Sequence, residues 1–158
     1  MSKTPESLIS IATATFYKNW HPYTPELSPD KVRGDLAIQF AKTAVDKGFS
    51  VTVVDAGSPS TFKENLEQVG AHVYTEVDRG MSGSRRQALT EASRVPGSKV
   101  LAWIEPEKVS LVRDALPQAA EPLLQGKADI VVPARNDQAF ATYPFQQAAF
   151  EFRSASCF

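Results

Sequence analysis

Asp55 closes the β-branched, largely apolar run Phe49–Asp55 and is followed by the turn residues Ala56-Gly57-Ser58. A carboxylate at the end of such a strand is costly unless it faces solvent or a hydrogen-bond donor. In that position it could accept hydrogen bonds from the base or ribose of a nucleotide. The other interpretation is structural, because aspartate beside glycine and serine commonly caps its own turn.

Gly80–Arg86 (GMSGSRR) combines small residues with two arginines at the expected start of a helix. The free N–H groups of a helix N-terminus attract anions, and the guanidinium groups of Arg85 and Arg86 could hold a phosphate by paired hydrogen bonds. The alternative is a surface turn followed by solvated arginines. Both interpretations remain open from the sequence.

Glu105-Pro106-Glu107 places two carboxylates two positions apart, directly after the apolar run Lys99–Ile104. Proline fixes the backbone between them, and carboxylate oxygens suit Mg²⁺ or Mn²⁺ held jointly with phosphates. As an isolated motif it has a simpler interpretation, because acidic residues at the start of a helix interact favourably with its dipole.

Several familiar nucleotide and hydrolase motifs are missing from the sequence. No G-x-G-x-x-G loop follows the first expected strand, and no G-x-x-x-x-G-K-[ST] is present. Gly80–Ser84 departs from G-x-S-x-G at its last position, and no well-placed histidine supports a serine nucleophile. A standard dinucleotide site, a P-loop and a serine hydrolase are therefore not expected.

Short β-branched runs alternate with longer helical patterns, which is typical of βα units. The sequence predicts strands at residues 8–15, 49–55, 71–76, 99–104 and 129–133. The helices expected between them are one from Ser28-Pro29 to Gly48, one through Phe62, Leu66 and Val69, one carrying Ala88, Leu89 and Ala92, and one from Val109 to Gln125 that Pro117 breaks or kinks. In the first of these helices Val32, Leu36, Phe40 and Ala44 recur at helical spacing, which predicts its buried face.

Near-continuous apolar runs in the second, fourth and fifth of these strands indicate burial on both faces. The predicted fold class is therefore α/β, with a mainly parallel, Rossmann-like sheet between helix layers. Ligands of such folds bind beyond the carboxyl ends of the strands. Asp55, Gly80–Arg86 and Glu105–Glu107 all follow predicted strands and should meet at that edge.

The composition fits one globular domain spanning residues 1–158. With 17 basic and 18 acidic residues, the net charge of −1 gives no electrostatic case for a nucleic-acid or anionic-membrane partner. No apolar run approaches the roughly 18–20 residues of a membrane helix. Polar residues interrupt Leu8–Phe16, so a signal peptide is not expected, and we predict a cytoplasmic protein with a free Cys157.

Phe145, Ala148, Ala149 and Phe152 recur on one helical face near the end of the chain. An amphipathic helix must bury that face against something. We expect either that the natural domain continues past Phe158, or that self-association or a partner covers the Phe145/Phe152 face. A helix that docks on this domain and ends there is the alternative.

Taken together and in this order, the motifs resemble those of family-2 glycosyltransferases with the GT-A fold. Val53–Ser58 (VVDAGS) is similar to the V-V-D-D-G-S strand end of that family, and Gly80–Arg86 to its Gly-x-x-x-Ala-Arg-Asn helix start. Glu105-Pro106-Glu107 stands in the place of the D-x-D motif, and Ala128–Pro133 looks like the next strand. The resemblance covers about Leu8 to Arg135.

The resemblance implies a domain that binds a nucleotide-diphosphate sugar donor for transfer to an acceptor that the sequence does not identify. Thr13 and Ala14 would border the nucleotide, Asp55 would contact the base, Arg85 would lie near the diphosphate, and Glu105 would approach the ribose or the metal. The implied nucleotide-sugar-binding residues are thus Thr13, Ala14, Asp55, Gly57, Arg85 and Glu105, and the implied ligand of Mn²⁺ or Mg²⁺ is Glu107.

The sequence also departs from the family pattern. Ala56 replaces the second aspartate of D-D-G-S, and each carboxylate of E-P-E is longer by a methylene. Residues 137–158 leave room only for the start of the acceptor part, so the isolated chain should bind donor but catalyse weakly or not at all. The alternatives are a non-catalytic GT-A-like binding module and a sugar nucleotidyltransferase, although Thr15–Lys18 lacks the glycine-rich basic loop usual in the latter.

Overall fold

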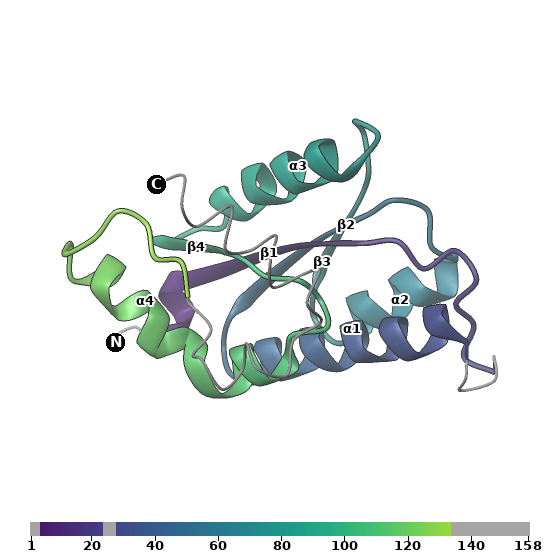
Figure 1. The fold of residues 1–158 in the computed structure, drawn as a ribbon, viewed down its shortest axis with the longest axis horizontal. Coiled ribbons are helices and arrows are strands. Elements are labelled where there is room, and N and C mark those ends of the chain that lie inside the picture. Colours follow the sequence, from purple (N-terminus) through teal and green to yellow (C-terminus); the bar gives the residue numbers. More distant parts are fainter. Residues whose placement is uncertain (1–3, 24–27, 134–158) are drawn as a thin grey trace, which may run out of the picture.

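The computed structural model describes residues 4–23 and 28–133, and these form an α/β fold. The strands are β1 (Ile9–Thr15), β2 (Ser50–Asp55), β3 (His72–Thr75) and β4 (Val100–Trp103). The helices are α1 (Pro29–Asp46), α2 (Ser60–Gln68), α3 (Met81–Ser93) and α4 (Leu116–Leu124), the last preceded by a π-helical turn, Leu111–Ala115 (Figure 1). The predicted fold class is confirmed.

All four strands are parallel, in the order β3-β2-β1-β4. The chain builds outward from β1 to β3 and then crosses back to place β4 on the other side of β1. The order in which strands are added to the sheet therefore reverses between β1 and β4. In parallel sheets the loops diverge at such a point and leave a crevice beyond the carboxyl ends of the strands.

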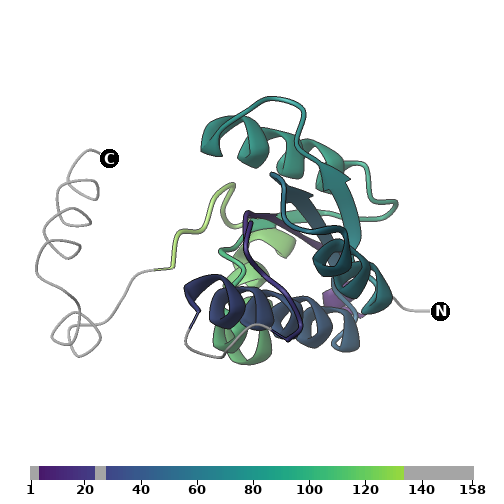
Figure 2. The ribbon, with the colours of Figure 1, turned by 90° about the vertical axis from the view of Figure 1, so that its right-hand side faces the viewer.

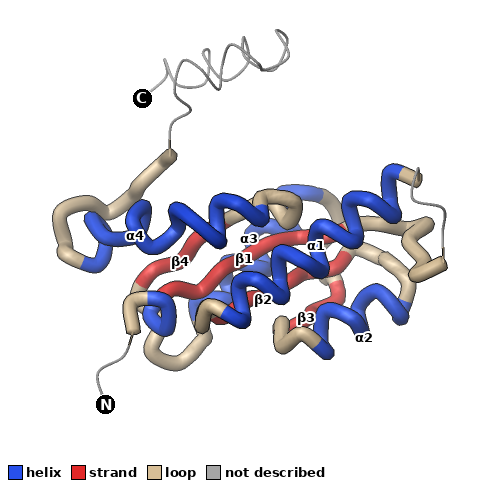
Figure 3. The backbone as a smooth tube through the Cα atoms, turned by 90° about the horizontal axis from the view of Figure 1, so that it is seen from below, coloured by secondary structure: helices blue, strands red, loops and turns tan. Residues whose placement is uncertain are grey.

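Helices cover both faces of the sheet. α3 lies on one face, and α1, α2 and α4 lie on the other, as Figures 1 and 2 show. Figure 3 looks onto the second face, with the strands behind α1, α2 and α4. The predicted arrangement of a parallel sheet between helix layers is thus confirmed.

Strand alternation divides the core into two unequal parts. Ile11 and Val53 point toward α1, α2 and α4 and belong to the larger cluster, which also contains most of the buried aromatic side chains. Ala12 and Val54 point toward α3 and pack against Ala88 and Ala92. Because the side chains on this second face are small, α3 can lie close to the strands.

The buried face of α1 differs from the predicted one. Phe40 and Ala44 are buried as expected, but Val32 is exposed, and the small residues Gly34 and Ala37 are buried instead. The helix boundaries were predicted well because proline and glycine mark them. The face of α1 that is buried depends on Trp20, whose ring packs against Gly34 of this helix. The hydrophobic periodicity of the helix does not show this contact, because Trp20 belongs to the preceding loop.

The fifth predicted strand is wrong, because residues 129–133 are irregular. Val131, Val132 and Pro133 line an apolar groove beside β4 without pairing to it. Proline lacks the N–H that a strand would donate, and the run is short. Consequently β4 is an edge strand of the described sheet, and Leu101, predicted to be buried on both sides, is 42% exposed.

The predicted kink at Pro117 has a structural counterpart. The wider π-helical turn Leu111–Ala115 comes just before this proline, and α4 resumes at Leu116. Since proline cannot donate a hydrogen bond to the preceding turn, a wider turn at this place is the expected adjustment.

Within the described ranges no helix is long and apolar enough to cross a membrane. Residues 134–158, including the Phe145/Phe152 face, lie outside those ranges.

Gly34 provides a test of the packing between α1 and the loop after β1. A Cβ atom at this position would lie 2.3 Å from Cδ1 of Trp20, whose indole N–H donates to Asp35 at 3.0 Å. Alanine gains about 1 kcal/mol of helix propensity, but overpacking costs about 1–3 kcal/mol. We therefore expect Gly34→Ala to lower the free energy of unfolding, measured by urea denaturation, by up to about 2 kcal/mol.

The control is Gln39→Ala, at an exposed position of the same helix, which should change stability by less than about 0.5 kcal/mol. A Gly34→Ala protein as stable as the wild type would contradict the tight contact with Trp20.

Candidate functional site

A cavity of about 530 Å³ lies at the carboxyl ends of β1 and β4, where the strand order reverses. Its volume lies in the range typical of small-molecule sites. The wall comes from the end of β1, the start of α3 and the loop after β4. The lining residues are Ala14, Thr15, Phe16, Tyr17, Arg33, Ala56, Glu76, Gly80, Met81, Ser84, Arg85, Trp103, Glu105, Pro106 and Glu107.

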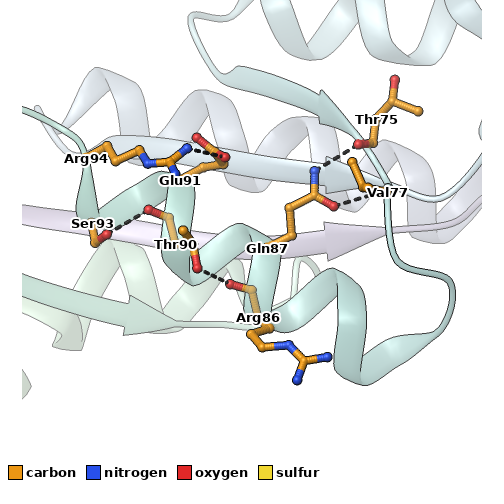
Figure 4. Close-up of polar contacts among 8 residues, drawn as sticks. All are labelled: Thr75, Val77, Arg86, Gln87, Thr90, Glu91, Ser93 and Arg94. Carbon is orange, nitrogen blue, oxygen red and sulfur yellow. Dashed lines mark hydrogen bonds and ion pairs between the residues drawn. The ribbon is translucent and has the colours of Figure 1, made fainter.

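The loop before α3 is held against the helix by side chains. Gln87 accepts a hydrogen bond from the Val77 N–H and donates one to the Thr75 carbonyl, each at 2.9 Å (Figure 4). Gly83 is needed where the helix meets this loop, because a Cβ atom there would lie 2.3 Å from the Asp78 carbonyl oxygen. The first turn of α3 is thereby fixed at the cavity.

A carboxylate from the preceding loop, that of Glu76, already lies at the start of α3. The Glu76 carboxylate accepts hydrogen bonds from the Gly80 N–H, at 3.0 Å, and from the Ser84 hydroxyl. A carboxylate at this place interacts favourably with the helix dipole. The helix N-terminus is therefore a weaker anion site than the sequence GMSGSRR predicts.

The two arginines of this helix differ in their surroundings. Arg85 lines the cavity, and its guanidinium carbon lies 4.8 Å from the centre of the Trp103 ring. This is the geometry of a cation–π contact. Arg86 is exposed and does not line the cavity. Within the described chain Arg85 takes part in no ion pair, so its charge is available to a ligand.

Asp55 is buried, at 1% exposure, and its carboxylate is engaged on both oxygens. Oδ1 accepts the N–H groups of Gly57, at 3.0 Å, and Ser58, at 2.8 Å, and Oδ2 accepts the Thr15 hydroxyl at 2.8 Å. These are the hydrogen bonds of the turn-capping interpretation. Asp55 does not line the cavity, and its contact with a base stays a prediction.

The remaining predicted residues are Thr13 and Ala14 of β1 and Gly57 of the turn after β2. Thr13 and Ala14 point to opposite faces of the sheet, because side chains alternate along a strand. Ala14 lines the cavity. Thr13 is buried toward the α1 layer, and its hydroxyl has no hydrogen-bond partner in the described chain. Gly57 adopts φ +120° beside the Phe16 ring, a conformation that favours glycine. The structure thus brings Ala14, Arg85, Glu105 and Glu107 to one cavity but leaves Thr13, Asp55 and Gly57 outside its lining.

Glu107 is the most constrained acid of the site. Its Oε1 accepts hydrogen bonds from the Tyr17 hydroxyl, at 3.0 Å, and from Nε of Arg33, at 2.8 Å, and Nη2 of Arg33 also lies at 2.8 Å. Glu105 differs, because its side chain is 66% exposed and its ion pair with Lys108 is long, at 3.8 Å. The two carboxylates of E-P-E therefore have separate environments.

These carboxylates fit a metal ion poorly. A guanidinium 2.8 Å from Glu107 would compete with a cation for the same oxygen. Among the residues that the structure describes, no group of three or more His, Cys, Asp or Glu side chains is arranged to hold a metal. The Mn²⁺ or Mg²⁺ ion stays a prediction from the resemblance.

Burial and the neighbouring Glu107 carboxylate raise the pKa of the Tyr17 phenol well above its usual value. The hydrogen bond to Glu107 also raises the pKa of Arg33. At neutral pH the three side chains therefore form a donor, an anion and a cation. Their arrangement ties the loop after β1 and the start of α1 to the loop after β4.

Several lining residues were not selected from the sequence, among them Arg33, Phe16 and Trp103. Arg33 lies 74 positions from Glu107, and no spacing rule links them. Phe16 is 58% exposed at the cavity, although its place directly after a strand was visible. Trp103 ends β4 and passed for an ordinary core residue.

Comparisons with known proteins do not identify a family for this chain. The sequence matches no model of a protein family, and no curated protein matches it significantly. The resemblance to glycosyltransferases therefore stays a prediction, and the side chains of the cavity have to carry the functional assignment.

Tyr17 predicts a pH dependence of stability. Its pKa is higher in the folded state than in the unfolded chain, so the stability that it contributes is present below pH about 10 and is lost as the pH rises further. Between pH 10 and 11, urea denaturation should show a steeper loss for the wild type than for Tyr17→Phe, by up to about 1.4 kcal/mol per pH unit.

Tyr74→Phe is the matched control, because Tyr74 lies on the edge strand β3 and is partly exposed. This variant should keep the wild-type slope. Equal slopes for the wild type and Tyr17→Phe would mean that the phenol does not titrate differently in the folded protein.

Proposed function

We propose that the cavity binds a nucleotide-diphosphate sugar and that the chain is the donor-binding part of a glycosyltransferase. The observation that carries the proposal is Arg85, whose guanidinium lies over the Trp103 ring at the point where the strand order reverses. Among residues 4–23 and 28–133 it forms no ion pair. A guanidinium forms paired, charge-assisted hydrogen bonds with phosphate oxygens. The cation–π contact with Trp103 orients the Arg85 guanidinium without neutralising its charge.

The remaining lining suits the rest of such a ligand. Ala14 and Ala56 have small side chains and leave room for a ligand at the carboxyl ends of β1 and β2. Phe16 presents an exposed ring on which a planar base can stack. Glu105 offers a solvent-accessible carboxylate that can accept hydrogen bonds from ribose hydroxyls.

Asp55 has a positioning role in this proposal. Its hydrogen bonds hold the turn that follows β2, and that turn carries Ala56 at the cavity wall. Transfer of the sugar would also need an acceptor site. A cytoplasmic location remains part of the proposal as predicted from the sequence.

A non-catalytic binding module is the second candidate. It is favoured by Glu107, which is tied to Tyr17 and Arg33 in the manner of a structural ion pair. The two candidates differ in turnover. Transfer of the sugar from a bound nucleotide sugar to water, which releases free sugar and the nucleoside diphosphate, would support the transferase. Binding without release is expected of both candidates, because this chain by itself should catalyse weakly or not at all.

Binding can be tested by thermal shift with UDP, GDP and their sugar conjugates. A ligand at 100 times its dissociation constant should add about 2.7 kcal/mol of stability. We expect one nucleotide to raise the melting temperature of the wild type. Arg85→Gln should weaken its binding by about tenfold or more, since a hydrogen bond to a charged group is worth about 1.5–3 kcal/mol.

Arg86→Gln is the control, because it removes the same charge from the same helix but outside the cavity lining. It should bind within about twofold of the wild type. If no nucleotide shifts the melting temperature of a folded sample, the proposed function is wrong.

A further inference from the structure

We propose that Arg33 is the second cationic contact for the diphosphate and serves in place of a metal ion at this site. The inference rests on the proposed function, because it assigns a residue to the same ligand. Arg33 belongs to the first turns of α1, lines the cavity and has a side chain that is 60% exposed. No motif in the sequence selects it.

Arg33 keeps hydrogen-bonding capacity for a ligand. Its contacts to Glu107 Oε1 come from Nε and Nη2, whereas a guanidinium carries five N–H donors. The groups on Nη1 are not used by these contacts. The planar fork of the guanidinium can therefore bind a carboxylate on one edge and phosphate oxygens on another.

Glu107, which holds Arg33, is itself held by Tyr17, and Tyr17 is fixed by several contacts. Tyr17 donates to the same oxygen of Glu107, and its ring lies 5.5 Å from the Arg33 guanidinium carbon. The ring also makes an edge contact with Phe62, with centroids 5.3 Å apart, and the Tyr17 N–H donates to the Ser58 hydroxyl at 2.9 Å. The buried Tyr17 side chain thus fixes the position of Arg33, although the Arg33 side chain is itself largely exposed.

A diphosphate in the cavity would need a second cation from the protein, because the helix terminus beside Arg85 is already occupied by a carboxylate. Glu76 already neutralises the N-terminal end of α3, so the helix contributes little to binding an anion. Arg85 approaches from α3 and Arg33 from α1, and these helices lie on opposite faces of the sheet (Figures 1 and 2). A diphosphate in the cavity between them would meet a guanidinium from each side.

The same geometry argues against Glu107 as a metal ligand. Its Oε1 is shared by a phenol and a guanidinium, and a divalent cation there would face the positive charge of Arg33 directly. Glu107 acts instead as the positioning residue of Arg33. Nucleotide binding should then be independent of a divalent cation.

The test is calorimetric titration of the folded chain with UDP, GDP and inorganic pyrophosphate, each with EDTA and with Mn²⁺. For the nucleotide that binds, we expect the wild-type affinity to change by less than about twofold between EDTA and Mn²⁺. Arg33→Gln should weaken binding by about tenfold under both conditions, and Arg33→Lys by less, because lysine keeps the charge but not the fork.

Glu107→Gln and Lys42→Gln complete the set. Glu107→Gln should change affinity equally with EDTA and with Mn²⁺, whereas a metal ligand would lose only the Mn²⁺-dependent part of binding. Lys42→Gln removes an exposed charge farther along α1 and should leave affinity within about twofold of the wild type. A single cooperative melting transition above the temperature of the titration shows that each variant is folded without ligand.

The outcomes separate the inference from the proposed function. Nucleotide binding that requires Mn²⁺, or that Arg33→Gln leaves unchanged, overturns the inference while the proposed function stands. Binding of pyrophosphate that depends on Arg33, with no preference for UDP or GDP, supports the contact with the diphosphate and overturns the nucleotide part of the function. A folded wild type that binds none of the probes overturns both.

Discussion

The buried carboxylate of Asp55 is the interaction on which the carboxyl edge of the sheet depends. A buried carboxylate is stable only if donors surround it, and its partners hold the turn after β2 in place. From this turn the Ser58 hydroxyl accepts the N–H of Tyr17, and the Tyr17 hydroxyl donates to Glu107, which pairs with Arg33. One chain of hydrogen bonds thus connects β2, the loop after β1, the loop after β4 and α1.

The two faces of the sheet contribute differently to the cavity. The face toward α1 and α2 carries the large buried side chains and this hydrogen-bonded chain, which together make a rigid wall. The face toward α3 is packed with small residues such as Ala88 and Ala92. α3 can therefore come close to the strands, and its first turn brings Arg85 over Trp103. The cavity lies where these two kinds of packing meet.

The chemistry proposed for the cavity follows from how its charges are paired. Glu76 and Glu107 are engaged by groups of the protein, whereas Arg85 and part of Arg33 remain available on the cavity side. Glu105, the third carboxylate of the lining, is exposed and lies 3.8 Å from Lys108. The proposed anionic ligand therefore depends on the guanidinium donors that the protein leaves available, not on an excess of positive charge in the lining.

The sequence alone determined the βα alternation, the parallel sheet and the edge at which polar residues gather, because hydrophobic period and turn residues are local properties of the chain. It could not separate Glu105 from Glu107, or show that the turn after β2 engages the Asp55 carboxylate and leaves it outside the cavity lining. Those outcomes depend on strand alternation within a register and on Arg33, 74 positions away from Glu107. Only the tertiary structure decides them, since pairing between distant side chains leaves no periodic trace in the sequence.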